Sequence, residues 1–129
     1  MVNTNFREYI LSTEKIIKAG KSAEQNDLLV STSKRNDILL HTIASGSPFV
    51  NLGDNPTQEE IKEAAIFCAI KSQDWRNNRN SVQVHVFSKN DCSKDKKAKD
   101  GSWMVKKIQN TIKAKKSDII KLEKEINNN

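Results

Sequence analysis

The hydrophobic and polar positions of the chain follow two different periods, which predict both strands and helices. Val82, Val84 and Val86 alternate with polar or aromatic residues, and this period of two is typical of a strand. After Thr57, apolar residues return every three to four positions instead, as on the buried side of a helix. Both kinds of element are therefore expected in one fold.

The clearest helix begins at Thr57, because Thr57 and Glu60 have the three-residue spacing of a capping box. We expect one long helix that continues to about residues 77–78. Its apolar face would consist of Ile61, Ala64, Ala65, Cys68, Ser72 and Trp75.

The N-terminal half predicts four strands and a short helix. Residues 9–12 and 15–19 are two apolar runs around a short polar turn, which indicates a strand pair. A glycine and a serine precede a short helix over about residues 22–32. The apolar runs 37–43 and 49–52, on either side of a Ser-Gly-Ser-Pro turn, predict two further strands.

The C-terminal half is more polar. Residues 88–101 form a lysine-rich connection, and residues 103–105 and 108–114 predict the last strands, joined as a hairpin. Ser117 is expected to cap a short final helix. Because the apolar seam of this helix covers only two turns, we expect residues 117–129 to be dispensable for folding, with a frayed tail. The seam consists of Ile119, Leu122 and Ile126.

The element order predicts an α+β fold with a mixed or antiparallel sheet packed against one long helix. A short helix follows the first strand pair, and another short helix ends the chain. We expect a single domain over residues 1–129, with its core at about 6–116.

Charge favours a polyanionic partner. The 129 residues include 22 Lys and Arg against 16 Asp and Glu, which gives a formal charge of +6 and a pI near 9.4. The N-terminal residues do not have the layout of a secretion signal, and no apolar run is long enough to span a bilayer. We therefore expect a cytoplasmic protein that binds no membrane.

The cysteines and histidines do not form a zinc motif, so we expect no metal and no cofactor. Cys68 lies in an apolar helical run, where a free thiol packs as a small hydrophobe. Cys92 lies in a basic segment that would lower its pKa. A disulfide between Cys68 and Cys92 remains open from the sequence. We expect neither cysteine to be catalytic.

Several blocks of residues occur in an order and at spacings typical of one known family. The first three blocks lie in the predicted short helix, the strand and turn after it, and the long helix, and the last is spread over the C-terminal half. The matching residues are Gly20-Lys21, Ala23, Gln25-Asn26 and Leu28-Leu29; Asp37-Ile38, Leu40-His41, Gly46-Ser47-Pro48 and Val50; Ala64-Ala65, Ser72 and Trp75; and Val82, Val84, Lys94 and Gly101.

Over about residues 9–116 the sequence resembles the NFACT-R domain, the RNA-binding module of ribosome quality-control proteins that add tails to stalled chains. It departs from the family at residues 92–97, which lack the usual proline. The larger members carry a catalytic-like domain and a long coiled coil that this sequence does not include, so their tail-adding activity is not expected here. The resemblance implies a binding module or adaptor that serves translation quality control or an RNA modification such as uridine thiolation.

Gly20 and Lys21 are the best candidate phosphate site. They do not form a P-loop, because that motif requires an earlier glycine where Lys15 stands. A glycine before a helix capped by Ser22 and Gln25 could still leave backbone N–H groups free for an anion, with Lys21 as an added cation. Alternatively, Gly20 makes the turn, Ser22 caps the helix and Lys21 is solvated.

Five other residues are candidates for RNA contact, each beside a structural alternative. His41 ends an apolar strand close in sequence to Ser47, a second candidate, and could contact RNA or be a satisfied packing residue. Asn26 could bind or cap. Arg76 and Arg79 could stack a base beside Trp75 or remain solvated.

The lysine-rich connection supplies further candidates for phosphate contact. On a net basic domain we expect these lysines to bind RNA, although such loops are often only soluble surface and nearby aspartates offset part of the charge. The candidates in this connection are Lys94, Lys96, Lys97 and Lys99.

The sequence therefore predicts a non-enzymatic RNA-binding module with no catalytic residues. By resemblance, its partner would be tRNA or rRNA, with the large ribosomal subunit as one location. Three alternatives remain: a subunit of a thiolation-type RNA-modifying enzyme using His41 or Cys92, a DNA-binding protein, and a protein-interaction adaptor that docks through its last helix.

Overall fold

The computed structural model describes residues 4–94 and 97–127 and contains a six-stranded antiparallel sheet. The strand order is β1-β2-β4-β3-β5-β8, and every neighbouring pair is antiparallel. This confirms the predicted α+β class and decides for the antiparallel alternative. The strands are β1 (Arg7–Ile10), β2 (Ile16–Ala19), β3 (Asp37–Thr42), β4 (Val50–Asp54), β5 (Val82–Ser88) and β8 (Asn110–Ala114).

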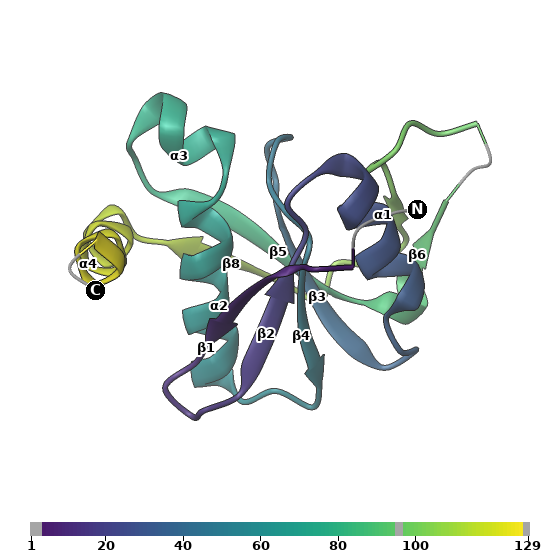
Figure 1. The fold of residues 1–129 in the computed structure, drawn as a ribbon, viewed down its shortest axis with the longest axis horizontal. Coiled ribbons are helices and arrows are strands. Elements are labelled where there is room, and N and C mark those ends of the chain that lie inside the picture. Colours follow the sequence, from purple (N-terminus) through teal and green to yellow (C-terminus); the bar gives the residue numbers. More distant parts are fainter. Residues whose placement is uncertain (1–3, 95–96, 128–129) are drawn as a thin grey trace.

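Helices lie against both faces of the sheet (Figure 1), and buried side chains form a separate hydrophobic core on each face. Helices α2 and α4 pack on the face that carries Leu40, whereas α1 packs on the opposite face against Leu39. Consecutive strand residues point to opposite faces, which explains why Leu39 and Leu40 are both fully buried. The helices are α1 (Ala23–Thr32), α2 (Gln58–Ile70), α3 (Gln73–Asn78) and α4 (Lys116–Asn127).

The first hairpin begins two residues earlier than predicted. Leu11 lies beyond β1, and its N–H donates to the carbonyl of Lys15 at 2.8 Å to open the turn. Glu14 closes the turn in the left-handed region, with φ 73°. The predicted turn at residues 13–14 is therefore confirmed, but the strand before it is shifted.

The predicted long helix is two helices. The capping box of Thr57 and Glu60 is present and starts α2 as expected. At Ser72 the backbone becomes extended, and the Ser72 hydroxyl accepts from the N–H of Trp75 at 3.2 Å, which caps α3. The sequence interpretation placed Ser72 on a continuous face because its spacing also fits one helix, whereas serine strongly favours the N-cap.

The predicted hairpin between residues 103–105 and 108–114 is wrong. β7 (Met104–Val105) pairs with β6 (Cys92–Ser93), which follows the short 3-10 helix η1 (Lys89–Asp91), and β8 pairs with β5. The two segments therefore belong to different sheets. Although the two segments are close in sequence, each pairs with a strand other than its neighbour: β7 with β6, and β8 with β5.

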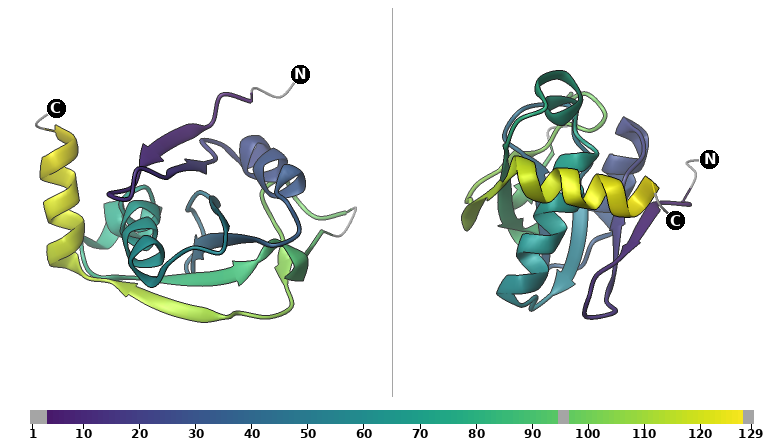
Figure 2. Two further views of the ribbon diagram at one scale, coloured as in Figure 1. Left: turned by 90° about the horizontal axis from the view of Figure 1, so that it is seen from below. Right: turned by 90° about the vertical axis from the view of Figure 1, so that its left-hand side faces the viewer.

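The terminal helix is part of the core, contrary to the expectation from its short seam. Ile119 is 0% exposed and Leu122 is 7% exposed. Ser117 lies inside the first turn instead of capping it, because α4 already begins at Lys116. α4 crosses α2 (Figure 2) and contributes Ile119 and Leu122 to the core beneath it.

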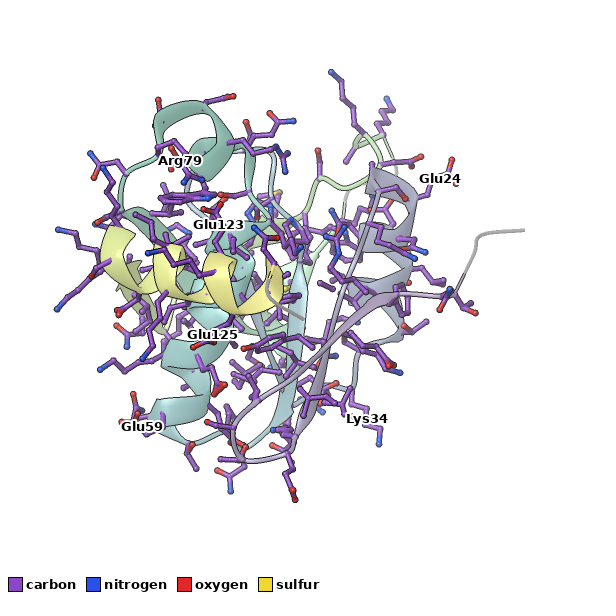
Figure 3. The ribbon with its side chains drawn as sticks, turned by 60° about the vertical axis from the view of Figure 1, so that its left-hand side comes forward. Glu24, Lys34, Glu59, Arg79, Glu123 and Glu125 are labelled. Carbon is purple, nitrogen blue, oxygen red and sulfur yellow. The ribbon has the colours of Figure 1, made fainter. Side chains whose placement is uncertain are left out.

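A polar contact also ties α4 to α3. The Arg79 guanidinium donates to both oxygens of Glu123 at 2.7 and 2.9 Å, and the Trp75 indole N–H donates to Glu123 at 3.2 Å (Figure 3). Hydrogen bonds from Arg79 and Trp75 lower the pKa of Glu123 to about 2. The C-terminal helix is therefore joined to the domain by packing and by charge.

Candidate nucleic-acid interface

A cleft of about 890 Å³ opens on the side of the sheet that α1 covers. Its walls come from the N-terminal end of α1, the loop between β3 and β4, the junction of α2 and α3, and residues 100–108. His41 is two residues from Leu39 on β3 and so shares the face of the sheet that packs on α1. Four segments far apart in the sequence therefore meet at one hollow surface.

Four cationic side chains line this cleft, and we call them the rim cations: Arg7, Lys21, Lys71 and Arg76. Among the residues that the structure describes, none of the four forms an ion pair. Burial and the nearby charges of Arg7 and Arg76 lower the pKa of Lys71. The cleft has these four cations against one lining carboxylate, Asp100, so its net charge is positive and favours the binding of an anion.

Two histidines lie side by side on the floor of the cleft. His41 of β3 is the direct cross-strand partner of His85 of β5, and both line the cleft. The His41 ring contacts the Phe49 ring at a centroid distance of 4.5 Å, and its Nδ1 lies 2.7 Å from the carbonyl oxygen of Thr42. Burial lowers the pKa of His41 despite that hydrogen bond, which favours the neutral ring.

One carboxylate holds the wall of the cleft that carries Trp103. Asp27 Oδ1 accepts from the Lys94 ammonium, from the N–H of Gly101 at 2.7 Å and from the Trp103 indole N–H at 3.1 Å. Lys94 also lies over the Trp103 ring, 5.4 Å from its centroid. A residue of α1 thereby fixes a segment more than seventy positions away in sequence.

Gly20 and Asn26 form a structural contact at the edge of the cleft. A Cβ atom on Gly20 would lie 2.1 Å from Asn26 Oδ1, so only glycine allows this approach. Asn26 Oδ1 in turn accepts from the N–H of Phe49 at 3.0 Å and joins α1 to the chain before β4. The family-like positions Gly20 and Asn26 are therefore explained by packing, and their contact with RNA stays a prediction.

The amide groups that were expected to be free at this turn have partners within the chain. The N–H of Gly20 donates to the carbonyl of Phe49 at 3.2 Å, and the N–H of Lys21 donates to Gln25 Oε1 at 2.9 Å. Ser22 caps α1 by accepting from the N–H of Gln25. The Lys21 side chain is exposed at the cleft, so the cation is available there but the Gly20 and Lys21 amides are not.

Replacing Gly20 by alanine is expected to destabilise the fold by about 2 kcal/mol, because Asn26 must move and lose its bond to Phe49. Chemical denaturation measures this free energy of unfolding. Lys21→Ala is the matched control at the next residue and should stay within about 0.5 kcal/mol of the wild type. Equal stability of Gly20→Ala and the wild type would contradict the packing role.

Ser47 is buried and serves the loop between β3 and β4. Its hydroxyl accepts from the N–H of Thr42 at 3.1 Å and donates to the carbonyl of Pro48 at 3.0 Å. It lines the cleft together with His41 and Arg76, but its hydrogen bonds are satisfied within the protein. RNA contact by Ser47 stays a prediction.

The two candidate arginines of α3 have different positions. Arg76 is exposed and lines the cleft. Arg79 is not among the cleft residues: its guanidinium lies 4.1 Å from the centroid of the Trp75 ring and pairs with Glu123. Arg79 therefore covers the Trp75 ring within the protein, which leaves Arg76 as the candidate arginine that lines the cleft.

Two lysines of the lysine-rich connection, Lys89 and Lys94, are engaged in contacts within the protein. The Lys89 ammonium donates to the carbonyls of Val30, Ser31 and Ser33 and so caps the C-terminal end of α1. Lys94 pairs with Asp27. Lys97 and Lys99 are exposed but do not line the cleft, and Lys96 lies outside the described residues.

Sequence reasoning missed several cleft residues: Arg7, Lys71, His85 and Trp103. The signal for His85 was present, because it alternates with the buried valines of β5 and must face the other side of the sheet. Arg7 and Lys71 carried no signal, since isolated surface cations look alike in a sequence.

Neither thiol favours nucleophilic chemistry. Burial raises the pKa of Cys68 to about 12 and that of Cys92 to about 11, although the charge of Lys89 opposes the rise at Cys92. The basic segment was expected to lower the pKa of Cys92, and burial outweighs it. Both cysteines are free thiols, so the disulfide left open by the sequence is absent.

Across the described part of the chain, His, Cys, Asp and Glu side chains form no group that could hold a metal ion. None of the helices in these residues has the length and apolar character needed to cross a membrane.

An α+β domain with a net cationic cleft is typical of a module that binds polyanions. The family model described as the NFACT protein RNA binding domain matches residues 5–107. The chain therefore belongs to the NFACT RNA-binding domain family, as its resemblance indicated.

The fold also matches a solved structure, that of the C-terminal part of the fibronectin/fibrinogen-binding protein from Streptococcus suis. The TM-score is 0.80 at 23% sequence identity, over 94% of this chain and 50% of the other. The chain thus spans half the length of that structure, and at this identity the likeness establishes the fold. No curated protein matches the sequence.

Proposed function

We propose that the protein binds structured RNA of the translation machinery, tRNA or rRNA, through the cleft, and that it serves translation quality control or RNA modification. The observation that carries the proposal is the convergence of the four rim cations, unpaired among the described residues, at one cleft of a domain in an RNA-binding family. The rim cations would neutralise phosphates, while the shape of the cleft would restrict which part of the RNA can enter.

The cleft suits binding better than chemistry. Burial raises the pKa values of both thiols, so neither favours the thiolate form. The raised values oppose the alternative of a thiolation-type enzyme subunit that uses Cys92. A binding module that presents RNA to other proteins fits the cleft residues more directly.

Removing two rim cations is expected to weaken RNA binding. In the double variant of Lys21→Ala and Arg76→Ala, the affinity for tRNA at low salt should fall at least about tenfold, because two phosphate contacts are lost. The slope of log affinity against log salt should flatten by about one for each residue. Fluorescence anisotropy titrations of labelled tRNA at several salt concentrations measure both quantities.

The matched control is Lys62→Ala, because Lys62 is an exposed lysine of α2 that does not line the cleft. It should bind like the wild type. Equal losses in the control and the double variant would show that net charge, and not the cleft, carries the binding. Equal affinity of the wild type for a DNA duplex of the same length would show that the site does not select RNA.

A further inference from the structure

The cleft combines two chemically different zones, and this combination bears on which part of an RNA it can hold. The rim cations contribute positive charge to the lining. The remaining lining includes imidazole, aromatic and aliphatic groups, among them His41, His85, Trp103 and Ile43. A site for phosphates alone would need only the first zone, so the second zone requires its own explanation.

The volume of the cleft is that of a site for a small unit. Pockets that enclose small ligands measure roughly 300–1,000 Å³, and the cleft has about 890 Å³. Paired RNA offers its ribose hydroxyls and phosphates across a wide, shallow groove, and its bases are stacked inside the helix. A hollow lined by imidazole and aromatic rings therefore fits a nucleotide whose base is not paired.

The paired histidines suit the polar edge of a base or a ribose hydroxyl. A carbonyl oxygen only accepts hydrogen bonds, so the contact with Thr42 assigns the proton of a neutral His41 ring to Nδ1. Its Nε2 is then an acceptor, and His85 lies beside it in register on the next strand. Exocyclic amino groups and 2′-hydroxyls are the donors that unpaired RNA would present.

Trp103 provides a ring surface that is already held in place. Its indole N–H is bonded to Asp27 and its ring lies beside the Lys94 ammonium, so the side chain does not lose further freedom when a ligand binds. Trp103 is partly buried, and the part of its ring that lines the cleft is the kind of aromatic surface on which unpaired bases stack.

We propose that the cleft holds an unpaired nucleotide at an end or loop of the bound RNA, with its phosphate among the rim cations and its base against Trp103 and the His41–His85 pair. This inference rests on the proposed function and names the RNA element that the same site selects. Duplex regions would contact the surrounding surface without entering the cleft.

Three RNA probes test the inference: a fully paired blunt duplex, the same duplex with a short single-stranded 3′ overhang, and that overhang with abasic residues. The wild type should bind the overhang about tenfold more tightly than the blunt duplex, which is the size expected for one stacked base. The abasic overhang keeps its phosphates but lacks the base, so it should lose most of this tenfold gain.

Variants connect this preference to the cleft. Trp103→Ala should reduce the tenfold preference to near one while affinity for the blunt duplex is retained, and Trp103→Phe should restore most of it because the ring is kept. Met104→Ala is the control, since Met104 is the neighbouring residue, 69% exposed and outside the cleft. Thermal unfolding of each variant shows whether a lost preference for the overhang reflects binding or folding. His85→Gln tests the histidine pair in the same assay with the three probes.

The outcomes separate the two proposals. Equal binding of blunt and overhang duplexes would overturn the inference and leave the proposed function intact. Equal binding of abasic and intact overhangs would also overturn it, because the cleft would then read phosphates alone. Failure of all three probes to bind would overturn the proposed function as well.

Discussion

Replacing Ile119 by alanine is expected to destabilise the domain by about 2–5 kcal/mol. Ile119 is fully buried in the core between α4, α2 and the sheet, so the change removes buried apolar surface and leaves a cavity. Denaturant titration followed by circular dichroism measures the free energy of unfolding. This result would reverse the sequence-based expectation that residues 117–129 are dispensable.

Ile126→Ala is the matched control for Ile119→Ala. The two residues have the same side chain and lie on the same helix, but Ile126 is 37% exposed and lies near the end of α4. We expect a cost below about 1 kcal/mol at Ile126. Similar small costs at both positions would mean that α4 does not belong to the folded core in solution.

Replacing Asp27 by alanine is expected to cost about 3 kcal/mol and to release the wall of the cleft that carries Trp103. The change leaves the Lys94 ammonium, the Gly101 N–H and the Trp103 indole N–H without their shared acceptor. The free energy of unfolding measures the first effect. Faster hydrogen exchange at the Gly101 amide measures the second.

Glu24→Ala is the control for Asp27→Ala. Glu24 is an acidic residue of the same helix that points into solvent (Figure 3), so its loss should change the stability by no more than about 0.5 kcal/mol. Unchanged exchange at Gly101 in Asp27→Ala would show that the carboxylate does not hold the wall.

The contribution of Asp27 should also depend on pH. Burial by itself would raise the pKa of Asp27, but the hydrogen bonds from Lys94, Gly101 and Trp103 outweigh it and lower the pKa below its ordinary value. A carboxyl with a lowered pKa in the folded state stabilises the fold above its unfolded-state pKa and loses that effect as pH falls through the folded value. The stability difference between wild type and Asp27→Ala should therefore be constant from about pH 5 to 8 and shrink below about pH 4.

Local signals in the sequence predicted most elements of the fold. The spacing of Thr57 and Glu60 located the start of α2, and the alternating valines located β5. Such signals act within a few residues, because a cap bonds the next turn and a strand alternates its faces. The same kind of signal led to a wrong prediction at Ser72. Its spacing fits a continuous helix, which was predicted, but it also fits the N-cap that the structure has.

The candidate site was predicted only in part. Three residues that the sequence suggested as RNA contacts do line the cleft: Lys21, His41 and Arg76. Lys94 and Arg79 looked equally suited to RNA contact, but each pairs with a carboxylate, Asp27 or Glu123, that no local pattern connects to it. A free cation and a paired one have the same sequence signature, since the partner can lie anywhere in the chain.

The sequence by itself determined the α+β class, the basic charge, the caps of α1 and α2 and the family to which the chain belongs, because each depends on composition or on short spacings. Tertiary structure alone decided which cations remain unpaired, that Ile119 completes the core, and that Arg7, His85 and Trp103 meet Lys21 at one cleft. The physical reason is that the burial of a side chain and the pairing of a charge depend on distances between segments that are far apart in the sequence. The antiparallel strand order β1-β2-β4-β3-β5-β8 of the folded domain sets those distances.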